Sequence, residues 1–451
     1  MVKIFKPTAN KALKGKNLTL TIERLDFNGR GVARYQNKPI FISGALAQEQ
    51  VKVRIIEQSS KYCVGQLLDV IKPSDVRSAP KCPHYKVCGG CDMQHIDESQ
   101  HVEIKQAKVT ELFARQKLLD LPWQDALVDS QWHYRRKARL GVQYHKNGNA
   151  VVGFREKHTN NVTPIKQCDV LLKPLSKLLP ELVATVNQLP AKSIGHIELV
   201  YTERQPAQQN QPIITLVIRQ LGKLTEAVKE RWQVFCQQAS NNSTFQVYFD
   251  FGQEKPLEPL NQVEGLSYLV DSDIEIAFEP SNFIQVHHQV NQQMISHAID
   301  WLSLSEQDKV LDLYCGLGNF SLPLAKRVAS VTGIEGVQAM VDKAANNASV
   351  NNLSNCQFYQ ANLNANWQSG AWLEQSYNKI LLDPARAGAL EACQQLGRFN
   401  ATDIVYVSCD PATLARDSAV LVAQGYQIKK IALMEMFGQT KHVETMVLFQ
   451  R

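Results

Sequence analysis

Apolar and polar residues alternate along several short runs in the first part of the chain. Residues 18–22 and 51–55 both place an apolar side chain at every second position, and glycine and proline residues separate such runs. A period of two is typical of a strand that buries one face. The pattern predicts about five short strands over residues 15–72, which suits a small OB-like β-barrel of the kind that often binds oligonucleotides.

The middle of the chain mixes the helical period with the strand period. Apolar residues recur at helical spacing from about 101 to 119. From about 133 to 270, short alternating runs flank turn signals such as Asn147-Gly148. We expect a mixed α+β domain in this region.

Longer apolar runs alternate with helical patterns from about residue 281 onward. Alternation of strand and helix is typical of an α/β fold with a parallel sheet, here of Rossmann-like organisation. The strand ends are expected near Tyr314, Ile334, Tyr359, Leu382 and Val407.

The 451 residues suit roughly three domains. We place these at residues 1–74, 75–275 and 276–451, which correspond to the barrel, the mixed domain and the α/β domain. A helical segment at about 95–125 could pack on the third domain.

Positive charge is concentrated at the start of the chain. The whole chain has 49 Lys or Arg and 43 Asp or Glu residues, yet its first 61 residues hold 12 basic and 4 acidic side chains. Such asymmetry points to an anionic partner, nucleic acid first, although a solvated basic face would look the same. The run Trp132–Arg139 interleaves aromatic and basic residues. It suits either a surface that stacks bases and contacts phosphates or a charged edge strand.

The chain shows no sign of a membrane or secreted protein. No apolar stretch approaches the ~20 residues of a membrane span, and the basic start lacks the apolar core of a signal peptide. We therefore expect a cytoplasmic protein with no membrane partner. Ten cysteines in a large cytosolic chain argue for metal or catalytic use rather than disulfides.

A glycine turn follows the predicted strand at 310–314. Gly316 and Gly318 let the backbone turn tightly and approach a ligand closely, while Ser321 stands where a dinucleotide fingerprint has its third glycine. Glu335 ends the next strand, 19 residues after Gly316, where an acid can accept hydrogen bonds from both ribose hydroxyls. S-adenosylmethionine fits such a site better than NAD, because no pyrophosphate cradle is needed.

Three further side chains follow strands of the same predicted sheet. Asn362 is placed to meet an adenine edge and Asp383 ends the fourth strand, although either residue could simply cap a helix. Cys409 follows the apolar run Ile404–Val407 and precedes a helix start, a position that would favour its thiolate. On its own, Cys409 is explained equally well as a nucleophile and as a small buried thiol.

Four cysteines have the spacing of a metal site. Cys82, Cys88 and Cys91 are close in sequence and Cys168 is distant. Three close thiolates with one distant thiolate suit a tetrahedral zinc ion or a [4Fe–4S] cluster equally well on spacing alone. Other zinc ligands could be His84 and His95.

Several segments together resemble the RNA uracil-5-methyltransferases, and the resemblance covers nearly the whole chain. The amino-terminal barrel resembles a TRAM domain, and the cysteine cluster narrows the resemblance to bacterial members that methylate 23S ribosomal RNA. Two segments depart from the usual pattern, His287-His288 and Phe437–Thr440. The matching segments are Phe283–Gln285, Asp312–Asn319, Asp383–Arg386, Ser408–Thr413 and His442–Glu444.

The resemblance implies a Rossmann-like S-adenosylmethionine-dependent methyltransferase domain and a role for each matching residue. Cys409 would be the nucleophile and Glu444 the general base. A [4Fe–4S] cluster, rather than zinc, would be held by Cys82, Cys88, Cys91 and Cys168. S-adenosylmethionine would be bound by Gln285, Tyr314, Asn319, Glu335, Asn362 and Asp383.

These roles predict an enzyme that methylates carbon 5 of a specific uridine in 23S ribosomal RNA. Cys409 would add to carbon 6 and so activate carbon 5, which is covalent catalysis, and Glu444 would then remove the carbon 5 proton. The alternatives are a transfer RNA uracil-5-methyltransferase and a non-catalytic RNA-binding factor in ribosome assembly. We expect a monomer whose partner is 23S ribosomal RNA.

Overall fold

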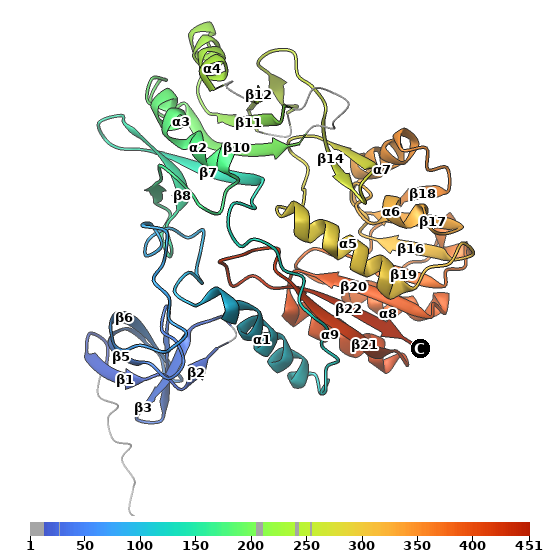
Figure 1. Cartoon of the computed structure of the whole chain (residues 1–451), viewed down its shortest axis with the longest axis horizontal. Helices are drawn as coiled ribbons and strands as arrows, with labels where there is room; N and C mark the ends of the chain where they lie inside the picture. Colours follow the sequence, from blue (N-terminus) through green and yellow to red (C-terminus); the bar gives the residue numbers. More distant parts are fainter. Residues whose placement is uncertain (1–12, 27, 204–210, 240–242, 253–254) are drawn as a thin grey trace, which may run out of the picture. The chain divides into compact units, whose positions relative to one another are not determined.

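Figure 1 shows the computed structural model, which describes residues 13–26, 28–203, 211–239, 243–252 and 255–451. These residues belong to two compact units. The first extends to Lys81 and includes Asp92–Ile104, and the second consists of Cys82–Cys91 and Lys105–Arg451. None of the described helices combines the length and the apolar character that crossing a lipid bilayer requires.

The first unit is built on a six-stranded sheet whose strands bury alternate side chains. In β5, every second residue from Val51 to Ile55 is buried, as the period of two predicts, and the buried faces enclose one small apolar core. The very short β2 brings the number of strands to six rather than five. In sheet order the strands are β1 (Asn17–Thr21), β5 (Gln50–Gln58), β6 (Cys63–Lys72), β4 (Lys38–Ile42), β3 (Gly31–Tyr35) and β2 (Arg24–Leu25).

The second unit contains two seven-stranded sheets, of which the first is mixed. Its strands β7 and β10 pair antiparallel, whereas β11 and β12 pair parallel. Three helices share an apolar core with this sheet, which agrees with the expected α+β character. The strands in sheet order, and then the helices, are β13 (Glu258–Pro259), β12 (Thr244–Asp250), β11 (Ile213–Gln220), β10 (Ile194–Thr202), β7 (Lys137–Tyr144), β8 (Ala150–Arg155), β9 (Val162–Pro164), α2 (Lys173–Lys177), α3 (Leu179–Val186) and α4 (Glu226–Ala239).

The other sheet has the predicted α/β organisation. Its first five strands are parallel. β22 pairs antiparallel with β20, and the edge strand β21 pairs antiparallel with β22. Each parallel strand ends within one residue of the end that the apolar runs predicted. In sheet order the strands are β18 (Cys356–Gln360), β17 (Ser330–Glu335), β16 (Lys309–Leu313), β19 (Lys379–Leu382), β20 (Asp403–Ser408), β22 (Glu444–Gln450) and β21 (Gln427–Met434).

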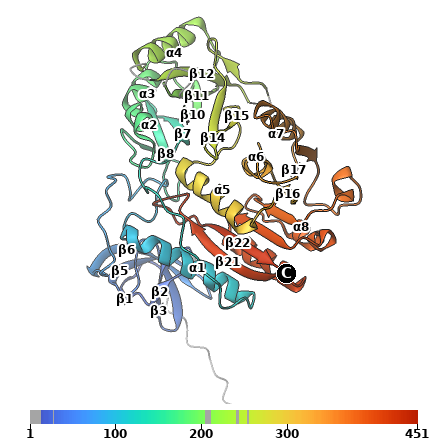
Figure 2. The ribbon, with the colours of Figure 1, turned by 45° about the vertical axis from the view of Figure 1, so that its right-hand side comes forward.

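Helices cover both faces of this sheet. On one face, residues of α5 and α6 share an apolar core with Val310, Leu381 and Val405 of the strands, and Figure 2 shows α5 lying along the sheet. On the opposite face, the Tyr406 hydroxyl donates a hydrogen bond to Asp417 on α9 at 2.7 Å. The helices are α5 (His288–Leu302), α6 (Ser321–Ala325), α7 (Gln338–Val350), α8 (Leu390–Gln395) and α9 (Pro411–Ala423).

The segment that follows α1 (His101–Arg115) runs along β21, the edge strand of the α/β sheet. The backbone N–H groups of Gln124 and Leu127 donate to the carbonyls of Ile431 and Leu433, both at 2.8 Å. These bonds satisfy backbone groups that an edge strand would otherwise leave unpaired. The remaining elements are a hairpin of β14 (Leu266–Val270) and β15 (Ile274–Phe278), and short turns of 3-10 helix at Glu98–Gln100, Ala371–Glu374 and Leu396–Phe399.

Candidate active site

Cys409 and Glu444 lie next to each other at the carboxyl end of β20. This strand is antiparallel to β22, and the last pair of their ladder is Ser408 with Thr445. The next residues outward on the two strands are therefore Cys409 and Glu444, and their side chains influence each other electrostatically. Sheet pairing thus brings together the two residues that the resemblance implied would act on the substrate.

The backbone around Cys409 is held by the start of α9. Asp410 is the N-cap of this helix, and its Oδ1 accepts hydrogen bonds from the N–H groups of Ala412 and Thr413, both at 3.0 Å. Pro411 occupies the first helical position, where its fixed φ angle suits a helix start. The half-buried Cys409 is consequently fixed between a strand end and a capped helix.

This thiol and two carboxyl groups near it have raised pKa values. Burial, together with Glu444 and Asp383, raises the pKa of Cys409 to about 12, against the opposing effect of Arg386. Burial raises the pKa of Asp383 to about 7, and burial with the nearby Asp383 raises the pKa of Glu444 well above its usual range. The expectation that the helix start would favour the thiolate is therefore wrong for the protein alone, because burial and two carboxyl groups outweigh it.

The glycine turn after β16 directs a backbone N–H group at Glu335. Gly316 and Gly318 have φ angles of +55° and +94°, and Tyr314 has a φ angle of +64°. The N–H of Gly316 donates to Glu335 Oε2 at 3.2 Å, and the N–H of Gly336 donates to Oε1 at 2.8 Å. The glycine turn and Glu335, which the sequence spacing assigned to one cofactor site, are thus in direct contact.

Two buried polar atoms next to this turn have no hydrogen-bond partner among the described residues. They are the Tyr314 hydroxyl and Asp312 Oδ1. Burial raises the pKa of Asp312 to about 7, even though Ser321 donates a hydrogen bond to its other oxygen. Buried polar atoms are usually satisfied, so these two mark a place where a polar ligand group is expected.

Asn319 is fixed by two neighbouring side chains. Its amide exchanges hydrogen bonds with the Asn291 amide at 3.0 and 3.1 Å, and the Tyr268 hydroxyl donates to its Oδ1 at 3.3 Å. These contacts hold the Asn319 side chain in one orientation at the turn.

Asn362 and Asp383 are not helix caps. Asn362 is exposed after β18 and accepts a hydrogen bond from the N–H of Asn364 at 3.0 Å, which closes a local turn. The N-cap of α8, the first helix after Asp383, is Ala389. The alternative reading of both residues as helix caps is therefore excluded.

A buried arginine holds the segment that contains Gln285. Arg136 Nε donates to the carbonyl of Gln285 at 2.8 Å, and the guanidinium lies 4.6 Å from the centre of the Tyr268 ring. Lys137 Nζ donates to two carbonyls of the same segment at 2.6 and 2.7 Å. Arg136 and Lys137, two basic residues of the 132–139 run, thus hold the loop that contains Gln285.

One of the two interpretations of that run needs correction. β7 begins at Lys137 and lies inside its sheet, between β10 and β8, so it is not an edge strand. Arg136 is only 5% exposed, so it is not available to bases or phosphates, but Arg139 of the same run is exposed. The interpretation of the run as a surface that contacts RNA stays a prediction. Nothing in the sequence except its place in the basic run marks Arg136, so its role in holding the Gln285 segment becomes visible only in the structure.

The two segments that depart from the family pattern meet at Tyr134. The ring of His287 stacks on Tyr134 with 4.7 Å between centroids, and the Tyr134 hydroxyl donates to the carbonyl of Gly438 at 3.0 Å. His288 lies beside Arg136, and burial together with this cation lowers the pKa of His288 to about 4. The departures therefore belong to one packed region next to the Gln285 segment.

The four predicted cysteine ligands lie in the second unit, where some of their thiols influence one another. Burial and the nearby Cys82 raise the pKa of Cys88, and burial with Cys88 and Cys82 raises the pKa of Cys168. Cys91 and Cys168 pack against the same apolar core. Among the described residues, however, no three His, Cys, Asp or Glu side chains are arranged to hold a metal ion. The metal cluster thus stays a prediction.

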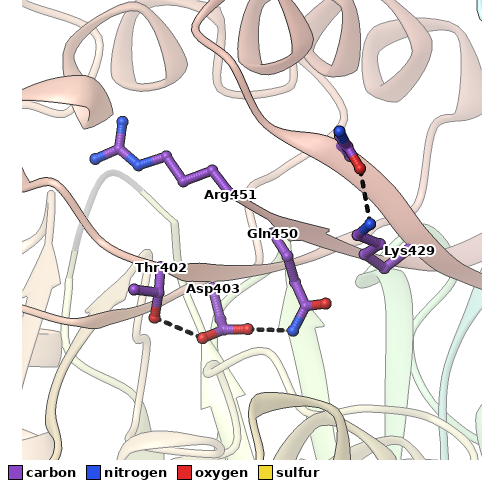
Figure 3. Close-up of a pocket in the computed structure, with 6 residues that line it drawn as sticks. Thr402, Asp403, Lys429, Gln450 and Arg451 are labelled. Atoms are coloured by element: carbon purple, nitrogen blue, oxygen red, sulfur yellow. Dashed lines mark hydrogen bonds between the residues drawn. The ribbon is translucent and has the colours of Figure 1, made fainter.

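Two pockets lie outside the region of Cys409. One, of about 360 Å³, is at the opposite end of β20 and is drawn in Figure 3, where Asp403 bonds to Thr402 and Gln450. The other, of about 290 Å³, is basic. It is lined by His133, Lys166, Gln167, Asp169, Lys173, Ser176, Lys177 and Pro180.

Comparison with curated proteins gives full-length relatives that share one printed name, 23S rRNA (uracil(1939)-C(5))-methyltransferase RlmD. The protein of that name from Colwellia psychrerythraea is 46% identical, over 100% of this chain and 99% of the relative. The one from Psychromonas ingrahamii is 41% identical over 100% of both chains, and the one from Vibrio cholerae is 40% identical over 100% of this chain and 99% of the relative.

A solved structure has the same fold. The crystal structure of Pyrococcus abyssi tRNA (uracil-54, C5)-methyltransferase in complex with S-adenosyl-L-homocysteine has a TM-score of 0.71 and is 21% identical, covering 96% of this chain and 100% of that chain. Residues 97–451 match the tRNA (Uracil-5-)-methyltransferase family, and residues 11–68 match the TRAM domain. The chain therefore belongs to the (uracil-5-)-methyltransferase family, with an amino-terminal TRAM domain.

Proposed function

We propose that this protein transfers a methyl group from S-adenosylmethionine to carbon 5 of a uridine in 23S ribosomal RNA. The observation that carries the proposal is the pairing of Cys409 with Glu444, near Asp383, at the carboxyl end of β20. Full-length relatives with the printed name of a 23S ribosomal RNA methyltransferase support the substrate.

The first step is addition of the Cys409 sulfur to carbon 6 of the uracil ring. A neighbouring carboxylate takes up the thiol proton, the new S–C bond forms, and the electrons of the carbon 5–carbon 6 double bond move into an enolate. Carbon 5 then attacks the methyl group, and S-adenosylhomocysteine leaves. Covalent catalysis of this kind divides one difficult step into easier ones. The target base must leave its stack to reach the thiol.

The second step needs a base, and Glu444 is placed to be that base. It removes the proton from carbon 5, the double bond forms again, and the Cys409 thiolate leaves. General base catalysis by a positioned side chain contributes about 10²–10⁴-fold. A carboxylate in a buried site, with a pKa that burial raises, is a stronger base than an exposed one.

The cofactor would lie over the glycine turn. Glu335 would accept hydrogen bonds from the ribose hydroxyls, and the buried hydroxyl of Tyr314 offers a polar group that has no partner among the described residues. Asn319 is held rigidly enough to orient a ligand. The proposed set is Gln285, Tyr314, Asn319, Glu335, Asn362 and Asp383.

We also propose a [4Fe–4S] cluster held by Cys82, Cys88, Cys91 and Cys168. The electrostatic influence of Cys82 on Cys88, and of both on Cys168, supports a common site for these thiols. When bound, the cluster would supply a covalent cross-link between segments that are distant in sequence. The methyl transfer itself requires only the cofactor, Cys409 and the carboxyl groups.

The deciding experiment is methyl transfer from labelled S-adenosylmethionine to unmodified 23S ribosomal RNA and to bulk transfer RNA. We expect label on the ribosomal RNA only, and none with Cys409→Ala, although that variant should still bind RNA. Label on transfer RNA would keep the chemistry and change the substrate. Undiminished transfer by Cys409→Ala would refute the proposed nucleophile.

A further inference from the structure

Two asparagine side chains from the end of α7 line one edge of the β14–β15 hairpin, which lies beside this helix (Figure 1). Asn347 Oδ1 accepts a hydrogen bond from the N–H of Ala277 on β15, and Asn347 Nδ2 donates to the carbonyl of Ala277, both at 3.1 Å. Asn351 makes the same two bonds with Glu275, at 2.9 and 2.7 Å. Each amide thus satisfies backbone groups that a strand edge would otherwise leave unpaired.

The spacing of the two elements explains this match. The two asparagines are four residues apart, a distance of about 6.0 Å along a helix. Their partners Ala277 and Glu275 are two residues apart, a distance of about 6.8 Å along a strand. Pairing with the strand uses the oxygen and one N–H of each amide, so the second N–H of each side chain can bind another group.

That second bond distinguishes the two asparagines. Asn351 Nδ2 donates to the carbonyl of Asn347 at 2.7 Å, within the end of its own helix. Asn347 Nδ2 instead donates to the carbonyl of Leu317 at 3.1 Å, and Leu317 belongs to the glycine turn of the candidate cofactor site. Because Asn347 is only 1% exposed, this bond is shielded from solvent.

The bond from Asn347 fixes a peptide group in the most adaptable part of the turn. Leu317 lies between Gly316 and Gly318, which have φ angles of +55° and +94°, and glycine loses more conformational freedom on ordering than any other residue. The N–H of Gly318, in the same peptide group as the Leu317 carbonyl, donates to the carbonyl of Cys315 at 2.9 Å. Both polar atoms of this peptide group are therefore held by the protein itself.

We propose that Asn347 is a positioning residue for S-adenosylmethionine, because it holds the glycine turn in its binding conformation through the Leu317 carbonyl. A turn that is already ordered costs little binding free energy to order when the ligand arrives, which raises affinity. The inference rests on the proposed function for the identity of the cofactor. Asn347 itself does not touch the cofactor in this account.

The test is calorimetric titration with S-adenosylhomocysteine. Asn347→Leu keeps the approximate size of the side chain but cannot hold the Leu317 carbonyl, and we expect it to weaken binding roughly 3- to 10-fold, as the loss of one buried hydrogen bond implies. Asn351→Leu is the matched control. It removes the same two bonds to the same strand edge without a contact to the turn, so it should leave the affinity unchanged.

A second variant keeps the test open if the leucine variant fails to fold. The carboxylate of Asn347→Asp still accepts a hydrogen bond from the N–H of Ala277, but it cannot donate one to the carbonyl of Leu317. Weaker binding is again expected. Denaturant unfolding without ligand measures the stability that each variant loses, and we expect a loss in both the Asn347 and the Asn351 variants.

A kinetic readout separates positioning of the cofactor from a general loss of structure. The Asn347 variants should show a raised KM for S-adenosylmethionine with little change in kcat, because saturating cofactor restores the order of the turn. Their affinity for RNA should be unchanged. A loss of RNA affinity as large as the loss of cofactor affinity would contradict the proposal.

The outcomes for the inference and for the proposed function are distinct. Equal losses of cofactor affinity in Asn347→Leu and Asn351→Leu, or no loss in either, would mean that the asparagines only stabilise the hairpin, and the inference would be overturned. An unmodified protein that binds S-adenosylhomocysteine but methylates no uridine would overturn the proposed function, and the inference about the turn would stand.

Discussion

At the scale of single residues, the site is defined by acidic groups whose pKa values are raised by burial, so that their ionised forms are disfavoured. Cys409, Asp383 and Glu444 each have a raised pKa, and each charge would disfavour the others. Perturbed groups that share one site are a common feature of active sites. Their clustering costs stability in the free protein, so it is best explained by the chemistry that they perform.

Asp383 gives a prediction with a defined sign. Its pKa rises from 3.8 to about 7 on folding, so the folded state holds the proton more tightly than the unfolded chain. Stability should therefore be lost as pH rises from about 4 to 7, by about 4 kcal/mol at most.

Asp383→Asn removes this penalty while it removes the carboxyl group. We expect the variant to be more stable than the unmodified protein at pH 8 but not at pH 4, and to lose methyl transfer. Denaturant unfolding of the two proteins, without RNA or cofactor, at both pH values measures the difference. An equal difference at pH 4 and pH 8 would contradict the raised pKa.

At the scale of elements, β16 and the turn that follows it form the candidate cofactor site. Gly318 has a φ angle of +94°, and a Cβ atom there would lie 3.0 Å from Leu322 Cγ. Gly316 has a φ angle of +55°, and a Cβ atom there would meet nothing within 4 Å. A side chain at Gly316 would therefore meet only backbone strain, whereas a side chain at Gly318 would meet both backbone strain and steric crowding.

Gly318→Ala should weaken binding of S-adenosylmethionine more than Gly316→Ala. A left-handed backbone costs a residue other than glycine roughly 1–2 kcal/mol, and only Gly318→Ala must also displace a side chain of the following helix. Calorimetric titration of both variants with S-adenosylhomocysteine measures the comparison. Equal losses would mean that backbone strain alone matters at this turn.

At the scale of the whole molecule, positive charge is concentrated in more than one place, and we expect RNA binding to depend on it. The sequence places a basic excess in the first 61 residues. The second unit adds the basic pocket with Lys166, Lys173 and Lys177, which has Asp169 as its one acidic lining residue among those described. These lysines come from a loop and a short helix, so their convergence is a product of folding.

Replacing Lys166, Lys173 and Lys177 together by alanine should weaken RNA binding uniformly across sequences. For each phosphate that a lysine no longer neutralises, the slope of log affinity against log salt should fall by roughly 1, so we expect a reduction of about 2–3. Binding titrations at several salt concentrations measure this slope. Lys229→Ala, which removes a lysine paired with Glu226 on α4, is the control and should leave the slope unchanged.

The sequence by itself determined which segments form strands and helices in the α/β sheet, because apolar periodicity reflects burial directly. The ends of its parallel strands and the Gly316 turn followed from the same local patterns. Motif resemblance singled out Cys409 and Glu444, although no local pattern related these two residues to each other.

Only the tertiary structure decided how distant residues act on one another. The register of β20 and β22 places Cys409 beside Glu444, and the fold buries Lys105 with Glu435. It also turns Arg136 inward to hold the Gln285 segment. The reason is physical: apolar periodicity shows which face of a helix or strand is buried, whereas pKa values and ion pairs depend on which residues of other elements contact that face.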